Sequence, residues 1–174
     1  MELYIVRHGL AGQSTEDADD DERALTPKGR QKTHKVAEGL RALGCRPGRI
    51  ATSPLKRAAE TAQVIADVVG PDAPLDACDF LVPGATAKAV AGWLATLDEA
   101  SVMIVGHMPD TAEIASGLIF GQPGADILFK KSAVCCISFE GAPAEGAGRL
   151  EWLLQPAQLC AIADSGQDCH GTGD

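Results

Sequence analysis

Aromatic residues are scarce in this 174-residue chain, and long hydrophobic runs are absent. Phe, Trp and Tyr make up only 4% of the sequence, so a core must be built largely from Val, Ile, Leu and Ala. No apolar run approaches the roughly 20 residues that a membrane-spanning helix needs. The N-terminus also lacks the basic and then apolar pattern of a secretion signal. We therefore expect a cytoplasmic protein with one domain over residues 1–160 and a flexible tail over 161–174.

The sequence also lacks the cysteine patterns of several kinds of site. No C-x-x-C pair occurs among the six cysteines, which are Cys45, Cys78, Cys135, Cys136, Cys160 and Cys169. This spacing favours free thiols over disulfides or a metal site, and a lone Cys169–His170 pair is only a weak indication of metal binding. No cysteine lies six positions before an arginine, as the anion-binding loop of cysteine-dependent phosphatases requires. A G-x-x-x-x-G-K-[ST] nucleotide loop is absent too, and we expect neither a metal nor a cofactor.

The net charge of −9 argues against nucleic acids and anionic membranes as general partners. The charge is unevenly distributed along the chain. Residues 16–22 (EDADDDE) hold six acidic side chains, whereas residues 23–57 hold ten basic side chains and one acid, Glu38. Each run is most simply a solvated surface. If the acidic run bordered a pocket, however, it would discourage the wrong anionic ligands.

Hydrophobic periodicity predicts strands that alternate with helices. Apolar strands are expected at residues 2–6, 49–52, 102–105, 134–139 and 150–154, with a further short one near residue 75. A hydroxyl residue followed by proline, a typical helix start, occurs at Thr26 and Ser53, and Thr86 is a third expected cap. The predicted helices cover residues 26–43, 53–69, 86–97 and 107–120. This order predicts an α/β protein, a three-layer α/β/α sandwich with a mostly parallel central sheet.

Basic side chains follow three of these strands at the point where each strand ends. Arg7 and His8 come directly after the first strand. Arg57 lies in the first turn of the helix after the second strand, and His107 follows the strand at 102–105. Because ligands of parallel α/β sheets bind beyond the carboxyl ends of the strands, we expect these four side chains to meet in one crevice.

Two arginines and two histidines suit a phosphoryl group. A guanidinium is always charged, and its paired N–H donors match phosphate oxygens. Helix N-termini at Arg57 and after His107 would add free N–H groups, and Gly9 would let the backbone approach the ligand closely. A neutral histidine nitrogen can attack phosphorus and carry the group covalently. A second, protonated histidine would stabilise the charge on the phosphoryl oxygens.

Six segments resemble the histidine phosphatase superfamily, whose signature is Arg-His-Gly after the first strand, and within it the small SixA-type phosphohistidine phosphatases. They are LYIVRHG (3–9), DDERALTPKGR (20–30), ATSPLKRAAETA (51–62), VMIVGHMP (102–109), KSAVCCISF (131–139) and GRLEWLLQP (148–156). The resemblance implies a phosphoglycerate-mutase-like fold and a metal-independent phosphatase. It makes His8 the phosphoryl-accepting nucleophile, and Arg7, Arg57 and His107 the rest of the phosphate pocket.

The identity of a general acid is left open by this resemblance. Asp79 and Asp110 are candidates, and neither is favoured over the other. An alkoxide leaving group needs a proton, and losing a general acid costs ~10²–10⁴-fold in rate. A phosphohistidine leaves as imidazole, whose pKa is about 6.5, so it depends less on such an acid. We therefore expect phosphohistidine on a protein as the substrate, as the resemblance also implies, for example on a histidine-phosphotransfer domain.

Two other functions remain open at this stage. A small-molecule phosphomonoesterase would act on a phosphorylated metabolite, although the short chain leaves little room for a capping insertion. A non-catalytic phosphoprotein-binding module would need only the arginines, so the presence of His8 argues against it. If the substrate is a protein, basic residues of the 23–57 run, such as Lys32 and Lys35, would dock its acidic surface and raise the association rate.

Overall fold

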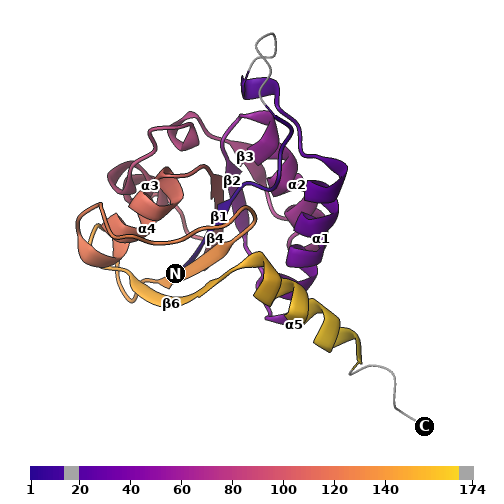
Figure 1. Ribbon diagram of the computed structural model, residues 1–174. Coiled ribbons are helices and arrows are strands. Elements are labelled where there is room, and N and C mark those ends of the chain that lie inside the picture. Colours follow the sequence, from indigo (N-terminus) through magenta and orange to yellow (C-terminus); the bar gives the residue numbers. More distant parts are fainter. Residues whose placement is uncertain (14–19, 169–174) are drawn as a thin grey trace.

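The computed structural model describes residues 1–13 and 20–168 and has a six-stranded sheet at its centre (Figure 1). The strands lie in the order β3-β2-β4-β1-β5-β6 across the sheet. Their bounds are Glu2–Arg7 (β1), Arg49–Thr52 (β2), Leu75–Ala77 (β3), Ser101–Gly106 (β4), Val134–Ser138 (β5) and Arg149–Leu154 (β6). Neighbours from β3 to β1 are parallel, whereas β5 is antiparallel to both β1 and β6. The prediction of a mostly parallel sheet is confirmed.

Helices cover both faces of the sheet, so the predicted three-layer arrangement is confirmed as well (Figure 1). One face carries α1 (Pro27–Ala42), α2 (Lys56–Val69) and α5 (Pro156–Asp168), and the other carries α3 (Ala87–Leu94) and α4 (Asp110–Phe120). Successive side chains of β1 alternate between the two cores, since strand residues point to opposite faces in turn. Ile5 packs with α3 and α4, and Val6 packs with α1 and α2.

The strands β2, β4 and β1 are adjacent and end at one edge of the sheet. In the register of the sheet Arg7 is paired with Gly106, and Thr52 is paired with Val105. Because the three strands are parallel, the segments that follow them leave the sheet side by side. These segments begin at His8, Ser53 and His107, so the topology brings the three predicted strand-end positions to the same place.

Two of the three predicted helix caps are confirmed, and the third is wrong. Thr26 Oγ1 accepts a hydrogen bond from the N–H of Gly29 at 2.9 Å, and Thr86 caps α3 in the same way. The helix expected at Ser53 begins only at Lys56, with no side-chain cap. The Ser53 hydroxyl lies before the helix, where it contacts His107 Nε2 and accepts from the N–H of Leu55.

The predicted flexible tail over 161–174 is wrong for residues 161–168, which continue α5. This helix is held because Leu159 and Ala163 are buried, and because Leu159 packs into the same core as Val36 and Leu40 of α1. Gly39 of α1 allows this contact, since a Cβ there would lie 2.1 Å from the carbonyl oxygen of Leu159. The Cys169–His170 pair and residues 16–19 of the acidic run lie outside the described residues.

The five described cysteines are free, in line with the sequence prediction. Cys135 and Cys136 are adjacent on β5 and lie in the two different cores, one on each face of the sheet. Burial raises the pKa of the Cys135 thiol to about 12, so this side chain is a packing group and not a nucleophile. No described helix is both long and apolar enough to span a membrane.

Candidate active site

The strand β1 ends by turning Arg7 and His8 toward the edge where β4 also ends. The N–H of His8 donates to the carbonyl of Gly106 at 3.0 Å, which continues the pairing with β4 by one residue. On the other side, the N–H of Ser132 donates to the carbonyl of Arg7 at 3.0 Å. The backbone around the two side chains is therefore fixed from both neighbouring segments.

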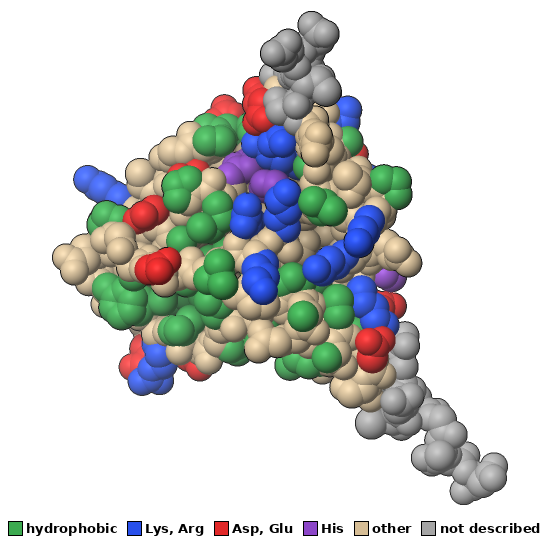
Figure 2. All heavy atoms as spheres, in the orientation of Figure 1, with side chains coloured by type: hydrophobic (Ala, Val, Ile, Leu, Met, Phe, Trp, Pro, Cys, Tyr) green, Lys and Arg blue, Asp and Glu red, His purple; other side chains and the backbone are tan. Residues whose placement is uncertain are grey.

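The four predicted side chains meet at this edge. The ring centroids of His8 and His107 are 5.2 Å apart, with the ring planes inclined at 53°. His8, Arg57 and His107 are 8%, 4% and 3% exposed, whereas Arg7 is half-buried. Arg7, Arg57 and His107 all lie close enough to act electrostatically on His8. In Figure 2 two neighbouring histidine side chains are visible on one face of the protein, with Lys and Arg side chains beside them.

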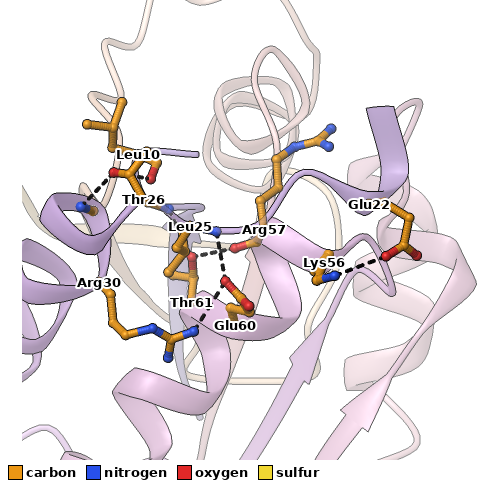
Figure 3. Close-up of polar contacts among 11 residues, drawn as sticks. Leu10, Glu22, Leu25, Thr26, Arg30, Lys56, Arg57, Glu60 and Thr61 are labelled. Carbon is orange, nitrogen blue, oxygen red and sulfur yellow. Dashed lines mark hydrogen bonds and ion pairs between the residues drawn. The ribbon is translucent and has the colours of Figure 1, made fainter. Parts of the chain in front are cut away.

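A hydrogen-bond network beneath Arg57 ties α2 to the loop that follows β1 (Figure 3). The Thr61 hydroxyl donates to the carbonyl of Arg57 at 2.6 Å and accepts from the N–H of Gly9 at 2.9 Å. The adjacent Glu60 accepts from the N–H of Leu25 at 2.7 Å. Arg57 and the residue after His8 are therefore positioned by a shared hydroxyl, although they are far apart in the sequence.

The structure gives a reason for glycine at position 9 that differs from the predicted one. A Cβ at this position would lie 2.6 Å from Thr33 Oγ1 and 3.0 Å from Leu25, both inside the protein. Thr33 in turn is hydrogen-bonded to Ser132 at 3.0 Å. Packing against α1 therefore requires glycine here, and a close approach of its backbone to a ligand stays a prediction.

Burial and neighbouring cations keep both histidines neutral at physiological pH. The pKa of His8 is lowered to about 3, chiefly by burial and also by the charges of His107, Arg57 and Arg7, whereas the hydrogen bond to Gly9 acts to raise it. Burial also lowers the pKa of His107 to about 4, with Arg57 adding to this effect. A protonated His107 that stabilises a bound phosphoryl group stays a prediction, since these pKa shifts describe the free protein.

The hydrogen bonds of the two rings indicate which nitrogen carries the proton. His8 Nδ1 lies 2.7 Å from the carbonyl oxygen of Gly9, which can only accept, so Nδ1 is protonated and Nε2 keeps its lone pair. His107 Nε2 lies 2.9 Å from the hydroxyl of Ser53. The N–H of Leu55 donates to the same hydroxyl oxygen at 3.3 Å. If the Ser53 hydroxyl donates to His107 Nε2, the ring proton of His107 is on Nδ1.

Three buried nitrogens of the cluster have no hydrogen-bond partner among the described residues. They are Arg7 Nε, Arg57 Nε and His107 Nδ1. A buried donor without a partner destabilises the folded protein. A bound oxyanion would supply several hydrogen-bond acceptors at once. The chemistry of this cluster is therefore that of a site for a phosphoryl or similar anionic group.

The structure also shows two residues at the site that the sequence did not single out. Ser53 contacts His107, as described above, although it was expected to cap a helix. Asp20, in the short 3-10 helix η1 (Asp20–Glu22), pairs with Arg57 at 3.1 Å and with Arg23 at 2.8 Å. Its carbonyl also accepts from Arg57 at 2.7 Å. Because Asp20 stands in an acidic run of similar residues, nothing in the sequence distinguished it from its neighbours.

Neither predicted candidate for a general acid makes a hydrogen bond or an ion pair with the four side chains in the part of the chain that the structure describes. Asp110 is buried at the start of α4, and its carboxylate accepts from the N–H of Gly84 at 2.9 Å, so it holds a loop on the α3 side. Asp79 is exposed in η2 (Asp79–Leu81) and has no hydrogen bond or ion pair with the four side chains in the part of the chain that is described. Asp20 does make such a contact, through its ion pair with Arg57.

An acid-stability measurement tests the two lowered histidine pKa values. The unfolded chain binds a proton on each histidine near pH 6.5, whereas the folded chain binds it only near pH 3 to 4. Stability is therefore full above pH 6.5 and falls as the pH drops, by about 1.4 kcal/mol per pH unit for each proton. We expect His107→Asn to show a shallower loss of stability than the wild type between pH 6.5 and 4 in urea unfolding.

The matched control for this measurement is His34→Asn, since His34 is exposed on α1. This control should keep the wild-type slope of stability against pH. It leaves both buried histidines in place, and the carboxylates that titrate in the same range are unchanged. Identical slopes for wild type and His107→Asn would contradict the neutral state of His107.

Comparisons with known proteins agree with this geometry. The sequence profile described as the histidine phosphatase superfamily (branch 1) matches residues 3–81. An uncharacterized protein of Picosynechococcus sp. (strain PCC 7002) is 38% identical over 138 residues, which cover 77% of this chain and 82% of the relative.

Solved structures extend the similarity over nearly the whole fold. The protein histidine phosphatase SixA, complexed with tungstate, is 25% identical, with a TM-score of 0.81 over 91% of this chain and 99% of that one. A SixA protein of Agrobacterium tumefaciens is 21% identical, with a TM-score of 0.73 over 88% of this chain and 96% of that one, and it shows the shared fold.

Proposed function

Because the chain belongs to the histidine phosphatase superfamily, we propose that it removes phosphoryl groups from phosphohistidine on a protein through a phosphorylated His8. The family supports phosphatase activity with a histidine nucleophile. The observation that carries the proposal for this chain is the burial of His8 and His107 side by side with Arg57 at the sheet edge. The SixA structure with tungstate adds support, since tungstate is an oxyanion like phosphate.

The first step is attack by His8 Nε2 on phosphorus. The nitrogen lone pair forms the new P–N bond while the P–N bond to the substrate histidine breaks. The substrate ring carries a proton on its other nitrogen, so it takes the electron pair of the broken bond and leaves as neutral imidazole. Nδ1–H of His8 stays bonded to Gly9, so the ring keeps its orientation and gains positive charge as it becomes phosphorylated. The low pKa of His8 favours this step, because the nitrogen needs no deprotonation at neutral pH.

The phosphoryl oxygens are stabilised by the other three side chains. Arg7 and Arg57 offer guanidinium N–H groups, and His107 offers Nδ1–H when the Ser53 hydroxyl donates to Nε2. In the second step a water oxygen attacks phosphorus and the P–Nε2 bond breaks. Inorganic phosphate leaves, and His8 returns to its neutral form.

A comparison of leaving groups tests the substrate class. Phosphohistidine should be hydrolysed with a kcat/KM that exceeds that of a simple alkyl phosphate ester by ~10²–10⁴-fold, because only the ester depends strongly on a general acid. The measurement is release of inorganic phosphate from a phosphohistidine peptide and from an alkyl phosphate at matched concentrations. Equal turnover of the two substrates would remove the argument for phosphohistidine.

A small-molecule phosphomonoesterase is the second candidate, and Asp20 is the observation that favours it. Its carboxylate touches Arg57 and acts electrostatically on His107, so it is close enough to be considered as a proton donor. Asp20→Asn separates the two possibilities. A loss of ~10²-fold or more on the ester alone would assign Asp20 as an acid. An equal loss on both substrates would show that Asp20 only positions Arg57.

A further inference from the structure

An open groove of about 440 Å³ lies beside the candidate active site. It runs between the first half of α1 and the loop before β5. Its charged lining consists of Arg7, two lysines of α1 and two lysines of the loop, which are Lys28, Lys32, Lys130 and Lys131. We call these four lysine side chains and the space between them the lysine groove. In Figure 2 Lys and Arg side chains gather on the face that also shows the histidines.

The four lysines of the groove are exposed and have no carboxylate partner within the described residues. This differs from Lys35 and Lys56, which pair with acids on the same side of the sheet. The chain has 24 acidic and 15 basic residues, so acids are plentiful, yet none lines this groove. Lys28 and Lys32 are one helical turn apart and repel each other. An anionic partner would relieve that repulsion.

The groove is joined to the catalytic edge of the sheet through Arg7. Arg7 lines the groove, and its Nη1 donates to the carbonyl of Phe129 at 2.6 Å. From the same loop, the N–H of Ser132 donates to the carbonyl of Arg7. The segment that carries Lys130 and Lys131 is therefore attached at both of its ends to the residue that precedes His8. An anion in the groove would lie next to the phosphoryl site.

We propose that the lysine groove docks an acidic segment of the protein substrate, next to the phosphohistidine; this rests on the proposed function. Small-molecule sites bury most of their ligand's surface, whereas this groove is open and its ammonium groups stand in solvent. Mobile point charges of this kind suit the capture and alignment of an extended anionic chain. A second phosphate on a small metabolite fits this geometry less well.

This assignment revises the docking residues that the sequence suggested. Lys32 lines the groove, but Lys35 does not. Lys35 is paired with Glu38 at 3.3 Å and with Asp164 of α5 at 2.8 Å, so its charge is already balanced. The loop lysines, Lys130 and Lys131, are distant in the sequence and reach the groove only through the fold.

The test compares wild type with the double variant Lys32→Glu/Lys130→Glu on three substrates. These are a phosphohistidine peptide flanked by Asp and Glu, the same peptide flanked by Ser and Asn, and free phosphohistidine. The double variant should lower kcat/KM for the acidic peptide ~10-fold or more, mainly through KM, and added salt should do the same to wild type. Its rates on the other two substrates should equal those of wild type.

The matched control is Lys88→Glu. Lys88 is exposed on α3, on the other face of the sheet, so this variant changes the net charge without touching the groove. It should hydrolyse all three substrates like the wild type. Equal losses of the double variant on free phosphohistidine and on the acidic peptide would overturn docking, and so would no loss on either.

A binding measurement keeps the docking proposal separate from the catalytic one. If wild type hydrolyses none of the three substrates, the proposed function fails, and fluorescence anisotropy with the unphosphorylated acidic peptide decides about docking. Salt-sensitive binding that the double variant loses supports the groove, and equal binding by both proteins overturns it. If the double variant is no longer inhibited by inorganic pyrophosphate but binds the peptide like wild type, the groove is a site for a second phosphate. This result would overturn docking as well.

Discussion

His8→Ala is expected to lower the turnover of phosphohistidine by ~10⁴-fold or more, because it removes the group that forms the covalent bond to phosphorus. The variant should still fold, since His8 Nδ1 makes a single hydrogen bond to the neighbouring Gly9 and its ring is held among cations. The measurement is single-turnover phosphate release, with the unfolding transition recorded alongside. His34→Ala is the matched control and should keep the wild-type rate, because His34 is exposed on α1.

Covalent trapping adds a readout that loss of folding cannot imitate. Rapid denaturation during turnover should leave an acid-labile phosphate on wild-type His8 and none on His8→Ala. Retention of near-wild-type rates by His8→Ala would sink the mechanism. If wild type and His8→Ala both bind the phosphopeptide and neither carries trapped phosphate, the result would instead support a binding module.

Arg57→Ala is expected to lower kcat/KM by ~10³-fold, a typical effect when an arginine that stabilises a transferring phosphoryl group is lost. Arg57 is almost fully buried, and its guanidinium pairs with Asp20 at 3.1 Å and acts electrostatically on His107. Arg57→Lys should recover only a small part of the rate, because an ammonium cannot make two parallel hydrogen bonds. Steady-state kinetics on the phosphohistidine peptide gives both values.

The control for Arg57 is Arg149→Ala on β6, whose guanidinium is exposed and makes one ion pair, with Glu140 at 3.7 Å. This control should match wild type. A loss of less than about tenfold in Arg57→Ala would show that Arg57 does not clamp the transferring group.

The sequence predicted the sheet and the convergence of the four side chains because both follow from strong local signals. Apolar strands that are each followed within a few residues by a basic side chain identify the carboxyl edge of a parallel sheet. The topology then leaves one place for Arg7, His8, Arg57 and His107 to meet. No information about distant contacts was needed for this step.

The parts that the sequence did not predict depend on contacts between distant residues. Ser53 has the local pattern of a helix cap, and only the neighbouring strand end shows that its hydroxyl bonds His107. Asp20 resembles the other acids of its run until the fold brings Arg57 beside it. The protonation of His107 likewise depends on burial, which periodicity does not report.

The packing of α5 on Gly39 has a consequence for any shortened form of this chain. Val36 and Leu40 of α1 share a core with Leu159, and the backbone of Leu159 lies where a side chain at position 39 would be. A chain cut before Leu159 would expose this apolar strip of α1 to water. Such a fragment would tend to self-associate, so truncation from the C-terminal side should stop short of this helix.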